Sequence, residues 1–418
     1  MALRKKIAIF CDGTWNDLSL ETPTNVVRLA KSVAAVSQKG EPQIVYYDEG
    51  VGVGAGIGRV TDSLTKYVGG ALGRGLDRKI EAAYRFLVLN YCPGDHIYIF
   101  GFSRGAYTAR SLCGLIRKCG ILRRDCFDQV PSALGHYRSS AHPDSPEMIE
   151  FRQRFGHALA TGWTDAETMA RVRESAPDLP PESDKEMLYQ YRPEHFYRMM
   201  FVGIWDTVGA LGVPSKLDFF GLNRRYRFHD TSASSLLSSI RHAVAANERR
   251  SLFDVTLFNN IDQLNGEWAT HRSASVSNPG HSRYAPYDYR PYQQRWFPGD
   301  HSSVGGGGSN RRLSSCGLLW IADGAQWAGL TLNTDATELR NAVREQDVCG
   351  NLGGNGTSGM PAGRVRAEGP AHLDEVSDEL SERWSRMPGY RPPNITVMAG
   401  AGGGPPVRQP PPPWMQFP

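Results

Sequence analysis

Short apolar runs alternate with amphipathic segments through the first third of the chain, and this order constrains the fold more than any other feature. The runs have the length of buried strands, and the segments between them carry apolar residues at helical spacing. The runs end at residues 11, 48 and 102, and the helical segments are 25–36, 76–91 and 104–120. The alternation predicts a mostly parallel sheet with helices on both faces, the α/β class, because parallel strands need helical crossovers.

The pattern weakens in residues 126–195, which are polar and proline-containing, and we interpret this stretch as a cap-like insertion. A strand is expected again at 195–206, followed by a long helix over 234–253. We predict a catalytic domain over 1–330, an extension over 331–395 with a short helix, and a flexible Gly/Pro-rich tail over 396–418.

Composition excludes several classes of function. The 418 residues carry a formal charge of only +4, so no nucleic-acid partner is expected. No apolar run is long enough for a transmembrane segment or a Sec-type signal peptide, so we expect synthesis in the cytoplasm and export, if any, by a dedicated secretion system. The seven scattered cysteines predict reduced thiols, and no cysteine–histidine spacing indicates a metal site.

The stretch "HIYIFGFSRGAYTAR" places Ser103 between two glycines, after an apolar strand and before a helix. This is the context of a nucleophile elbow, in which small flanking residues allow a sharp strand-to-helix turn. The start of the helix would stabilise negative charge at the serine. Because Gly-x-Ser-x-Gly also occurs by chance in a chain with 45 glycines, an ordinary turn with a capping serine stays open as the alternative.

A nucleophilic serine needs a base and a carboxylate that orients it, in the chain order Ser, Asp or Glu, His. Asp206 ends an apolar strand in "MMFVGIWDTVG", and His301 lies on a loop in "WFPGDHSSVGGGG". The alternatives are an Asx turn for Asp206 and a surface loop for His301. Asp300 is a competing acid, and His229 and His242 are competing histidines.

An oxyanion hole requires two backbone N–H groups near the serine. We expect one from Arg104 and the other from Gly13 or Thr14, in the loop after the first strand. Asp12 would shape that loop. His242, which lies in the predicted helix, would pack behind the triad without touching substrate.

Two other chemistries have weak signals. "IAIFCDGT" is similar to the start of aspartyl-phosphate phosphatases, but Phe10 stands where their nucleophilic aspartate is required. Gly50-x-Gly52-x-x-Ala55 is a loose dinucleotide fingerprint, and no acidic residue ends a second strand about 20 residues later. We therefore expect no cofactor.

Six stretches in this order resemble the DUF2235 family of α/β-hydrolase-like proteins, which is similar to the Tle1-type phospholipase effectors of type VI secretion. They are "FCDGTWND", "YYDEGVGVG", "GFSRGAYTAR", "VGIWDTVGALG", "RHAVAANERR" and "WFPGDHSSVGGG". The resemblance implies an α/β-hydrolase fold and a Ser103–Asp206–His301 triad that cleaves esters, in several members those of membrane phospholipids. Ser303 and Asn247 stand where the family usually has aspartate.

The sequence thus predicts a serine hydrolase that forms an acyl-enzyme, a lipase or phospholipase with a lipid substrate and contact with a membrane surface. Two alternatives stay open. One is an esterase or thioesterase for soluble substrates, and the other is a catalytically silent hydrolase-fold binding module.

Overall fold

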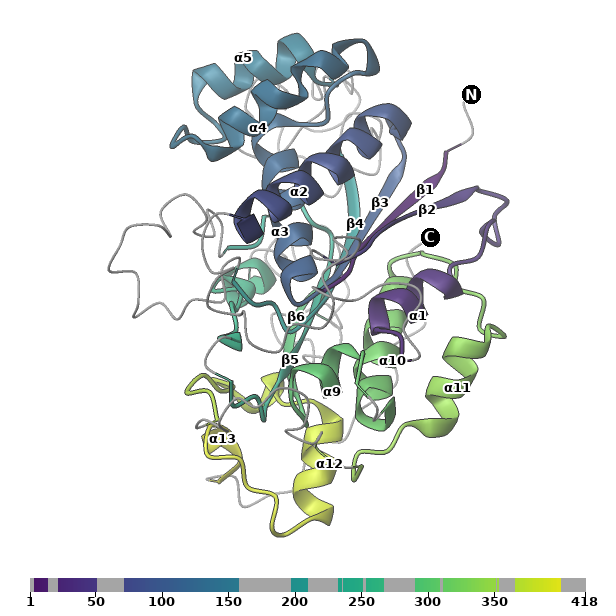
Figure 1. Ribbon diagram of the computed structural model, residues 1–418, viewed down its shortest axis with the longest axis vertical. Coiled ribbons are helices and arrows are strands. Elements are labelled where there is room, and N and C mark those ends of the chain that lie inside the picture. Colours follow the sequence, from purple (N-terminus) through teal and green to yellow (C-terminus); the bar gives the residue numbers. More distant parts are fainter. Residues whose placement is uncertain are drawn as a thin grey trace, which may run out of the picture.

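The fold is built on one six-stranded sheet in which every neighbouring pair is parallel, in the order β2-β1-β3-β4-β5-β6 (Figure 1). The computed structural model describes residues 4–13, 22–50, 71–157, 197–209, 232–234, 236–250, 253–266, 290–308, 311–350, 352 and 365–399. The strands are Lys6–Cys11 (β1), Gln43–Asp48 (β2), His96–Phe102 (β3), Arg198–Trp205 (β4), Ile240–Ala245 (β5) and Tyr292–Phe297 (β6). The predicted α/β class is confirmed.

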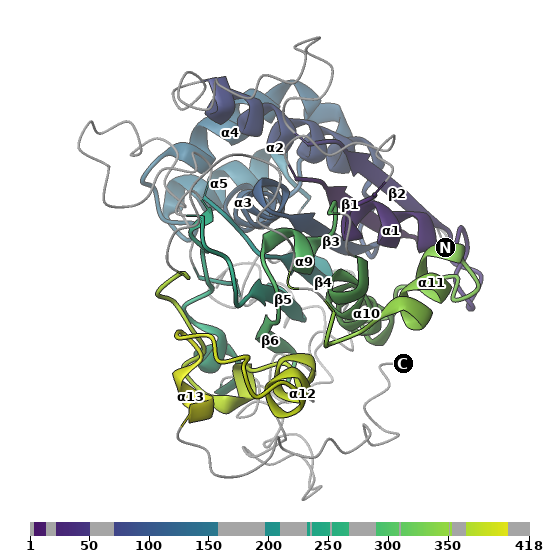
Figure 2. The ribbon, with the colours of Figure 1, turned by 60° about the horizontal axis from the view of Figure 1, so that its bottom comes forward.

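Helices cover both faces of the sheet and continue beyond its last strand (Figures 1 and 2). The longer helices are Asn25–Ser32 (α1), Ala71–Asn90 (α2), Arg104–Cys119 (α3), Val130–Arg138 (α4), Pro146–Phe155 (α5), Arg311–Trp327 (α10), Thr337–Glu345 (α11) and Asp378–Arg386 (α12). The short ones are Arg124–Gln129 (η1), His301–Gly305 (α9), Leu373–Glu375 (η8) and Thr396–Ala399 (α13). The α1 helix begins as predicted, because the Thr24 side chain accepts a hydrogen bond from the N–H of Val27.

Strand β1 shows why the sheet needs two layers of helices. All six of its residues are buried, and successive side chains enter different cores. Ile7 and Ile9 pack with α2 and α3, whereas Ala8 and Phe10 pack with α1 and α10. A strand buried on both faces reads as a continuous apolar run, which is what the sequence shows.

The helix predicted over 234–253 is wrong. Residues 240–245 form strand β5, which is fully buried between β4 and β6. His242 therefore lies on a central strand rather than on a helix. The stretch contains alanine and polar residues that also suit a helix. Only pairing with the strands on either side, β4 and β6, determines that it adopts the extended conformation.

The C-terminal segment, residues 365–399, packs against the outer strand β6. Its apolar side chains form a separate core with Trp296 of β6, through Val376, Leu380, Tyr390 and Ile395. The N–H of Ser377 also donates to the Trp296 carbonyl, at 3.0 Å. The predicted domain boundary at residue 330 stays a prediction, but the chain beyond it is joined to the sheet. No helix in the described ranges is both long and apolar enough to cross a membrane.

Candidate functional site

The turn between β3 and α3 is as tight as a nucleophile elbow requires. Ser103 is buried and holds φ 59° and ψ −123°, a backbone conformation that residues other than glycine rarely adopt. A Cβ added at Gly105 would lie 2.1 Å from the carbonyl oxygen of Cys11, and one at Gly101 would lie 2.5 Å from the carbonyl oxygen of Gly105. Glycine is therefore needed at both flanks, because the start of α3 lies against the end of β1 at Gly105 and against the end of β3 at Gly101.

Asp206 occupies the corresponding position on the neighbouring strand. It directly follows β4, is completely buried and holds φ 34°. Ser103 and Asp206 are the two non-glycine residues with positive φ in the described part of the chain. Backbone strain of this kind persists only where the surrounding structure enforces it, and it is concentrated at functional sites.

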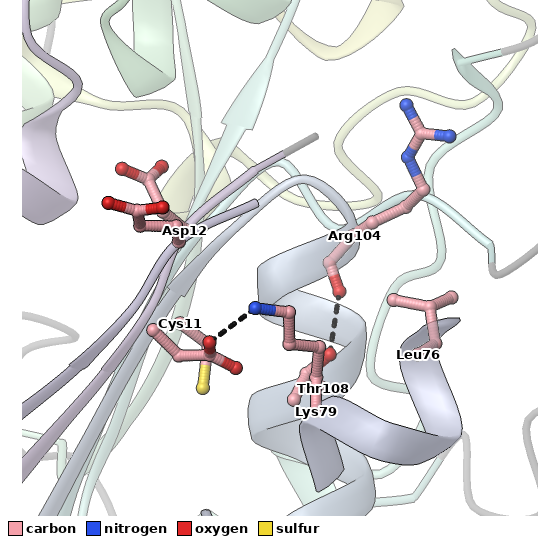
Figure 3. A pocket seen from close by; sticks show the side chains of 8 residues that line it. Cys11, Asp12, Leu76, Lys79, Arg104 and Thr108 are labelled. Carbon is pink, nitrogen blue, oxygen red and sulfur yellow. Dashed lines mark hydrogen bonds and ion pairs between the residues drawn. The ribbon is translucent and has the colours of Figure 1, made fainter. Parts of the chain in front are cut away.

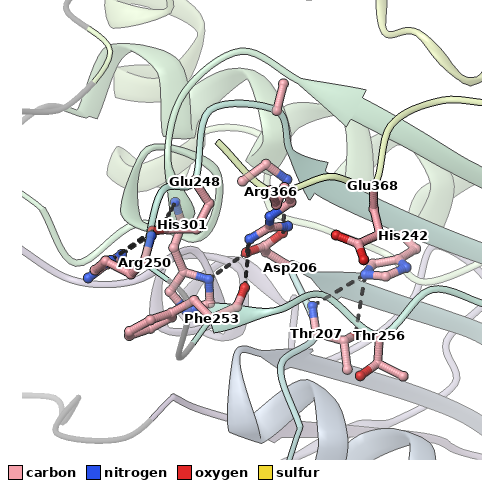
Figure 4. Close-up of polar contacts among 12 residues, drawn as sticks. Asp206, Thr207, His242, Glu248, Arg250, Phe253, Thr256, His301, Arg366 and Glu368 are labelled. Carbon is pink, nitrogen blue, oxygen red and sulfur yellow. Dashed lines mark hydrogen bonds and ion pairs between the residues drawn. The ribbon is translucent and has the colours of Figure 1, made fainter. Parts of the chain in front are cut away.

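His301 contacts Asp206. Its Nδ1 lies 2.6 Å from Asp206 Oδ2, although the two residues are 95 positions apart (Figure 4). Because a carboxylate only accepts hydrogen bonds, Nδ1 is the donor and Nε2 is left for another partner. The loop predicted for His301 is wrong, since this residue begins the five-residue helix α9.

Aromatic rings hold the imidazole beside the elbow. The His301 ring packs on Phe102, the residue before Ser103, with 4.5 Å between ring centroids. Phe253 packs edge-on against the same ring, at 4.7 Å. The competing acid Asp300 accepts hydrogen bonds from the N–H and hydroxyl of Ser303 and so caps α9. His229 lies outside the described residues.

Charged partners keep Asp206 ionised. Burial alone would raise the pKa of its carboxyl, but the charge of Arg366 and the hydrogen bond from His301 outweigh burial and hold that pKa far below its ordinary value. Arg366 donates from Nη1 to Oδ1 at 2.8 Å and from Nη2 to Oδ2 at 3.0 Å. No sequence signal predicts Arg366 at this site, because it lies 160 positions after Asp206 in a stretch with no recognisable motif.

Glu248 is a second buried carboxylate near His301 that the sequence analysis did not select. Its Oε2 accepts a hydrogen bond from the backbone N–H of His301 at 3.1 Å, and Arg250 binds both of its oxygens (Figure 4). Burial would raise the pKa of Glu248, but Arg250 lowers it to about 2. Glu248 is therefore ionised, and its carboxylate fixes the start of α9.

His242 lies under the site rather than in it. Its Nδ1 donates to Gln294 Oε1 at 2.9 Å, and its Nε2 accepts from the N–H of Thr207, the residue after Asp206, at 3.3 Å. Burial, together with the charge of Arg110, lowers the pKa of His242 to about 3. The ring is therefore neutral and supports the turn that carries Asp206.

The two sides of the expected oxyanion hole differ. The N–H of Arg104 is among the first of α3 and needs no partner within the helix. The N–H of Gly13 donates to Asp12 Oδ1 at 2.6 Å, so an oxyanion would compete with that carboxylate. Thr24 and Tyr47 both donate to Asp12 Oδ2, at 2.8 Å, which fixes the loop as expected of Asp12. Thr14, Gly52 and Ala55 lie outside the described residues.

A small pocket lies beside the elbow, lined by Cys11, Asp12, Asp48, Glu49, Leu76, Lys79, Arg104 and Thr108 (Figure 3). It has room for about one water molecule. Lys79 pairs with Asp48 at 2.5 Å, whereas the guanidinium of Arg104 extends away from this pair. No cluster of metal ligands occurs in the part of the chain that is described.

Both departures from the family motif are accommodated by hydrogen bonds. The Ser303 hydroxyl donates to Asp300 at 2.8 Å and lies 3.0 Å from the carbonyl oxygen of Leu352. Asn247 Oδ1 accepts from the N–H of Gly299 at 2.9 Å and from the Tyr390 hydroxyl at 2.7 Å. Among the described residues, neither side chain forms a hydrogen bond with the side chain of Asp206 or His301.

The chain is similar to several known proteins over part of their length. An uncharacterised protein of Saccharomyces cerevisiae, YEL023C, is 26% identical over 262 residues, which is 61% of this chain and 33% of that protein. An uncharacterised protein from Pseudomonas aeruginosa has 19% identity and a TM-score of 0.40, over 82% of this chain and 49% of its own. The Tle1 effector bound to the VgrG spike of a type 6 secretion system has 17% identity and a TM-score of 0.28, over 72% and 51%.

This chain thus spans about a third of the yeast relative and about half of each solved structure. A family model described as "T6SS, Phospholipase effector Tle1-like, catalytic domain" matches residues 5–324, which include the elbow, Asp206 and His301. The resemblance seen in the motifs is confirmed, and the chain belongs to the Tle1-like catalytic domain family.

Proposed function

We propose that this chain is a serine hydrolase that cleaves carboxylic esters of phospholipids through Ser103, Asp206 and His301. The observation that carries the proposal is the bond between His301 and Asp206 beside the turn that holds Ser103. Ser103 lies on a strained elbow at the start of α3, and His301 packs on Phe102 while its Nδ1 is bound to Asp206. The family description supports lipid as the substrate class.

In this mechanism His301 Nε2 takes the proton of the Ser103 hydroxyl, and Oγ attacks the ester carbonyl. The tetrahedral oxyanion is stabilised by the Arg104 N–H and by an N–H from the loop after β1. His301 then protonates the leaving alcohol, and water hydrolyses the acyl-enzyme by the same route. Asp206 keeps the imidazole in the required tautomer throughout.

The side chain of Arg104 favours an anionic ester over a neutral one. It is partly buried, and burial lowers its pKa to about 10. Within the described residues no carboxylate pairs with its guanidinium, and burial is the cause of the lowered pKa. A cation that no carboxylate of the described ranges neutralises, one residue from the nucleophile, suits the phosphate of a phospholipid.

The test is an activity panel of phospholipid vesicles, triglyceride emulsions and short soluble esters, with the wild type and Ser103→Ala. We expect vesicle hydrolysis and labelling by a fluorophosphonate probe in the wild type, and neither in Ser103→Ala. Hydrolysis of soluble esters alone would favour the esterase alternative. A folded wild type that neither labels nor hydrolyses any ester would favour a silent binding module.

Arg104→Met separates substrate preference from catalysis. We expect this variant to lose phospholipid activity relative to its activity on neutral esters, because only the former carries a phosphate. Arg85→Met is the matched control, since Arg85 lies on α2 in a surface pair with Glu81. Equal losses on both substrate classes would contradict the role of Arg104.

We extend the proposal to delivery by a dedicated secretion machine, with contact at a membrane surface. The support is the description of the matched family as effectors of type VI secretion. The comparison of exported protein in strains with and without that machine tests this extension independently of the chemistry.

A further inference from the structure

The carboxylate of Asp206 has no free acceptor position. Oδ1 accepts from the N–H of Ala245 at 2.9 Å and from Arg366 at 2.8 Å. Oδ2 accepts from His301 at 2.6 Å and from Arg366 at 3.0 Å. These four bonds fix the plane of the carboxylate, so that Oδ2 faces His301 Nδ1.

Arg366 is itself fixed by contacts with two neighbours of the site. Its Nη2 also donates to the carbonyl of Phe253 at 2.9 Å, and its backbone N–H donates to the carbonyl of Glu248 at 3.0 Å. Its side chain is 2% exposed. Phe253 contacts the His301 ring and Glu248 contacts the His301 N–H, so Arg366 binds Asp206 and both of these neighbours.

We propose that Arg366 is a positioning residue of the Ser103 site, and hence that the C-terminal segment, residues 365–399, completes the catalytic unit. This segment lies outside residues 5–324, which the family model matches. The inference rests on the proposed function in taking Asp206 as the acid and His301 as the base. Arg366 acts through Asp206 and does not touch the reacting atoms.

Arg366 also neutralises the negative charge that Asp206 presents to His301. Two buried carboxylates face this histidine, Asp206 at the ring and Glu248 at the backbone, and each is paired with one arginine, Arg366 and Arg250 respectively. The other ionisable groups nearby are Asp300, which caps α9, Glu368, whose charge acts on Arg366, and neutral His242 (Figure 4). Without Arg366, the unneutralised Asp206 would favour the protonated imidazole, so the base would stay protonated, and therefore inactive, up to a higher pH.

The experiment compares Arg366→Gln and Arg366→Lys in the full chain. For Arg366→Gln we expect kcat on phospholipid vesicles to fall about 100-fold, with KM nearly unchanged, because the carboxylate loses its orientation. We expect the acidic limb of the kcat/KM profile to move up by about one pH unit. Arg366→Lys keeps the positive charge but loses the two-point contact of the guanidinium with Asp206. We therefore expect kcat to fall about tenfold while the acidic limb of the profile stays where it is in the wild type.

Arg383→Gln is the matched control for a merely structural role. Arg383 lies on α12 in the same segment and is equally buried, but it donates to the carbonyls of Val348 and Gly350 and not to the site. We expect it to lower the midpoint of thermal unfolding while the pH profile stays that of the wild type. If Arg383→Gln reproduces the shifted limb, or if Arg366→Gln leaves it in place, the proposal is overturned.

NMR titration of the His301 imidazole separates this proposal from the proposed function. We expect its protonation midpoint to be higher in Arg366→Gln than in the wild type, whether or not any ester is hydrolysed. If the wild type hydrolyses no ester but the midpoint is higher in Arg366→Gln, the hydrolase is rejected and the positioning role is retained. An unshifted midpoint would reject the positioning role. If Arg366→Gln does not fold, the tenfold loss and unshifted limb expected of Arg366→Lys decide the matter.

Discussion

Ser103 and Asp206 follow a pair of residues that lie side by side in the sheet, and both hold their backbone at positive φ. Phe102 of β3 is in register with Trp205 of β4, and the N–H of Ser103 donates to the Trp205 carbonyl at 3.0 Å. The sheet therefore brings the proposed nucleophile and acid to one edge before any loop is considered. Ligands of open parallel sheets bind at this carboxyl edge.

The first prediction concerns Asp206→Asn. We expect kcat for ester hydrolysis to fall by about four orders of magnitude, because an amide no longer enforces the tautomer in which His301 Nε2 accepts a proton. We also expect a loss of roughly 3–5 kcal/mol in the free energy of unfolding, because Arg366 stays buried without its counter-ion. Steady-state kinetics and urea denaturation measure the two effects.

Asp300→Asn is the control for Asp206→Asn. Asp300 is next to His301 in sequence, but its carboxylate caps α9 and does not bind the ring. We expect a cost of at most about 1–2 kcal/mol and a much smaller loss of rate. Comparable losses of rate in the two variants would contradict the choice of acid.

The second prediction tests the close packing at the elbow. Gly105→Ala places a Cβ 2.1 Å from the Cys11 carbonyl oxygen, so α3 must move away from β1. We expect the free energy of unfolding to fall by several kcal/mol, as it does when a core is severely overpacked, and we expect Ser103 to lose labelling by the fluorophosphonate probe. Gly135→Ala on α4 is the control, since its Cβ meets nothing within 4 Å, and it should stabilise by about 0.5–1 kcal/mol. Equal stability of the two variants would show that the elbow can relax.

The third prediction concerns acid stability through Glu248. Its pKa in the folded protein is about 2, below the ordinary value of 4.5, so its ionised form stabilises the fold at neutral pH. That contribution is present above about pH 4.5 and is lost as the pH falls towards 2. We expect Glu248→Gln to cost roughly 2–3 kcal/mol at pH 7 and little at pH 2, measured by urea denaturation across this range. A cost that does not vary with pH would refute the assignment.

The fourth prediction concerns His242 at milder acidity. Its pKa is about 3 in the folded protein, whereas the ordinary value, which applies to the unfolded chain, is 6.5. Between these two pH values the unfolded chain therefore binds a proton that the folded chain does not. Stability should therefore fall as the pH is lowered from 6.5 to 3, by at most about 1.4 kcal/mol per pH unit. His242→Gln should remove this slope. His142→Gln, at a side chain that is 74% exposed, should leave it unchanged.

Features that depend on neighbours in the chain were determined by the sequence alone. The strand, turn and helix around Ser103, the start of α1 at residue 25 and the alternation that makes a parallel sheet all follow from local propensity and apolar periodicity. Asp206 and His301 were selected because motif order restricts the choice of partners, and their catalytic roles stay a proposal. Each of these signals lies within a few residues of the feature that it specifies.

Only the tertiary structure decided that residues 240–245 are a strand, that His301 begins a helix, and that Arg366 binds Asp206. A central strand is stabilised by partners on both sides, which a local pattern does not contain. Arg366 lies 160 positions from its carboxylate, in a stretch without periodicity or motif. Its role follows from burial, since a carboxylate removed from water needs a cation wherever the chain can supply one.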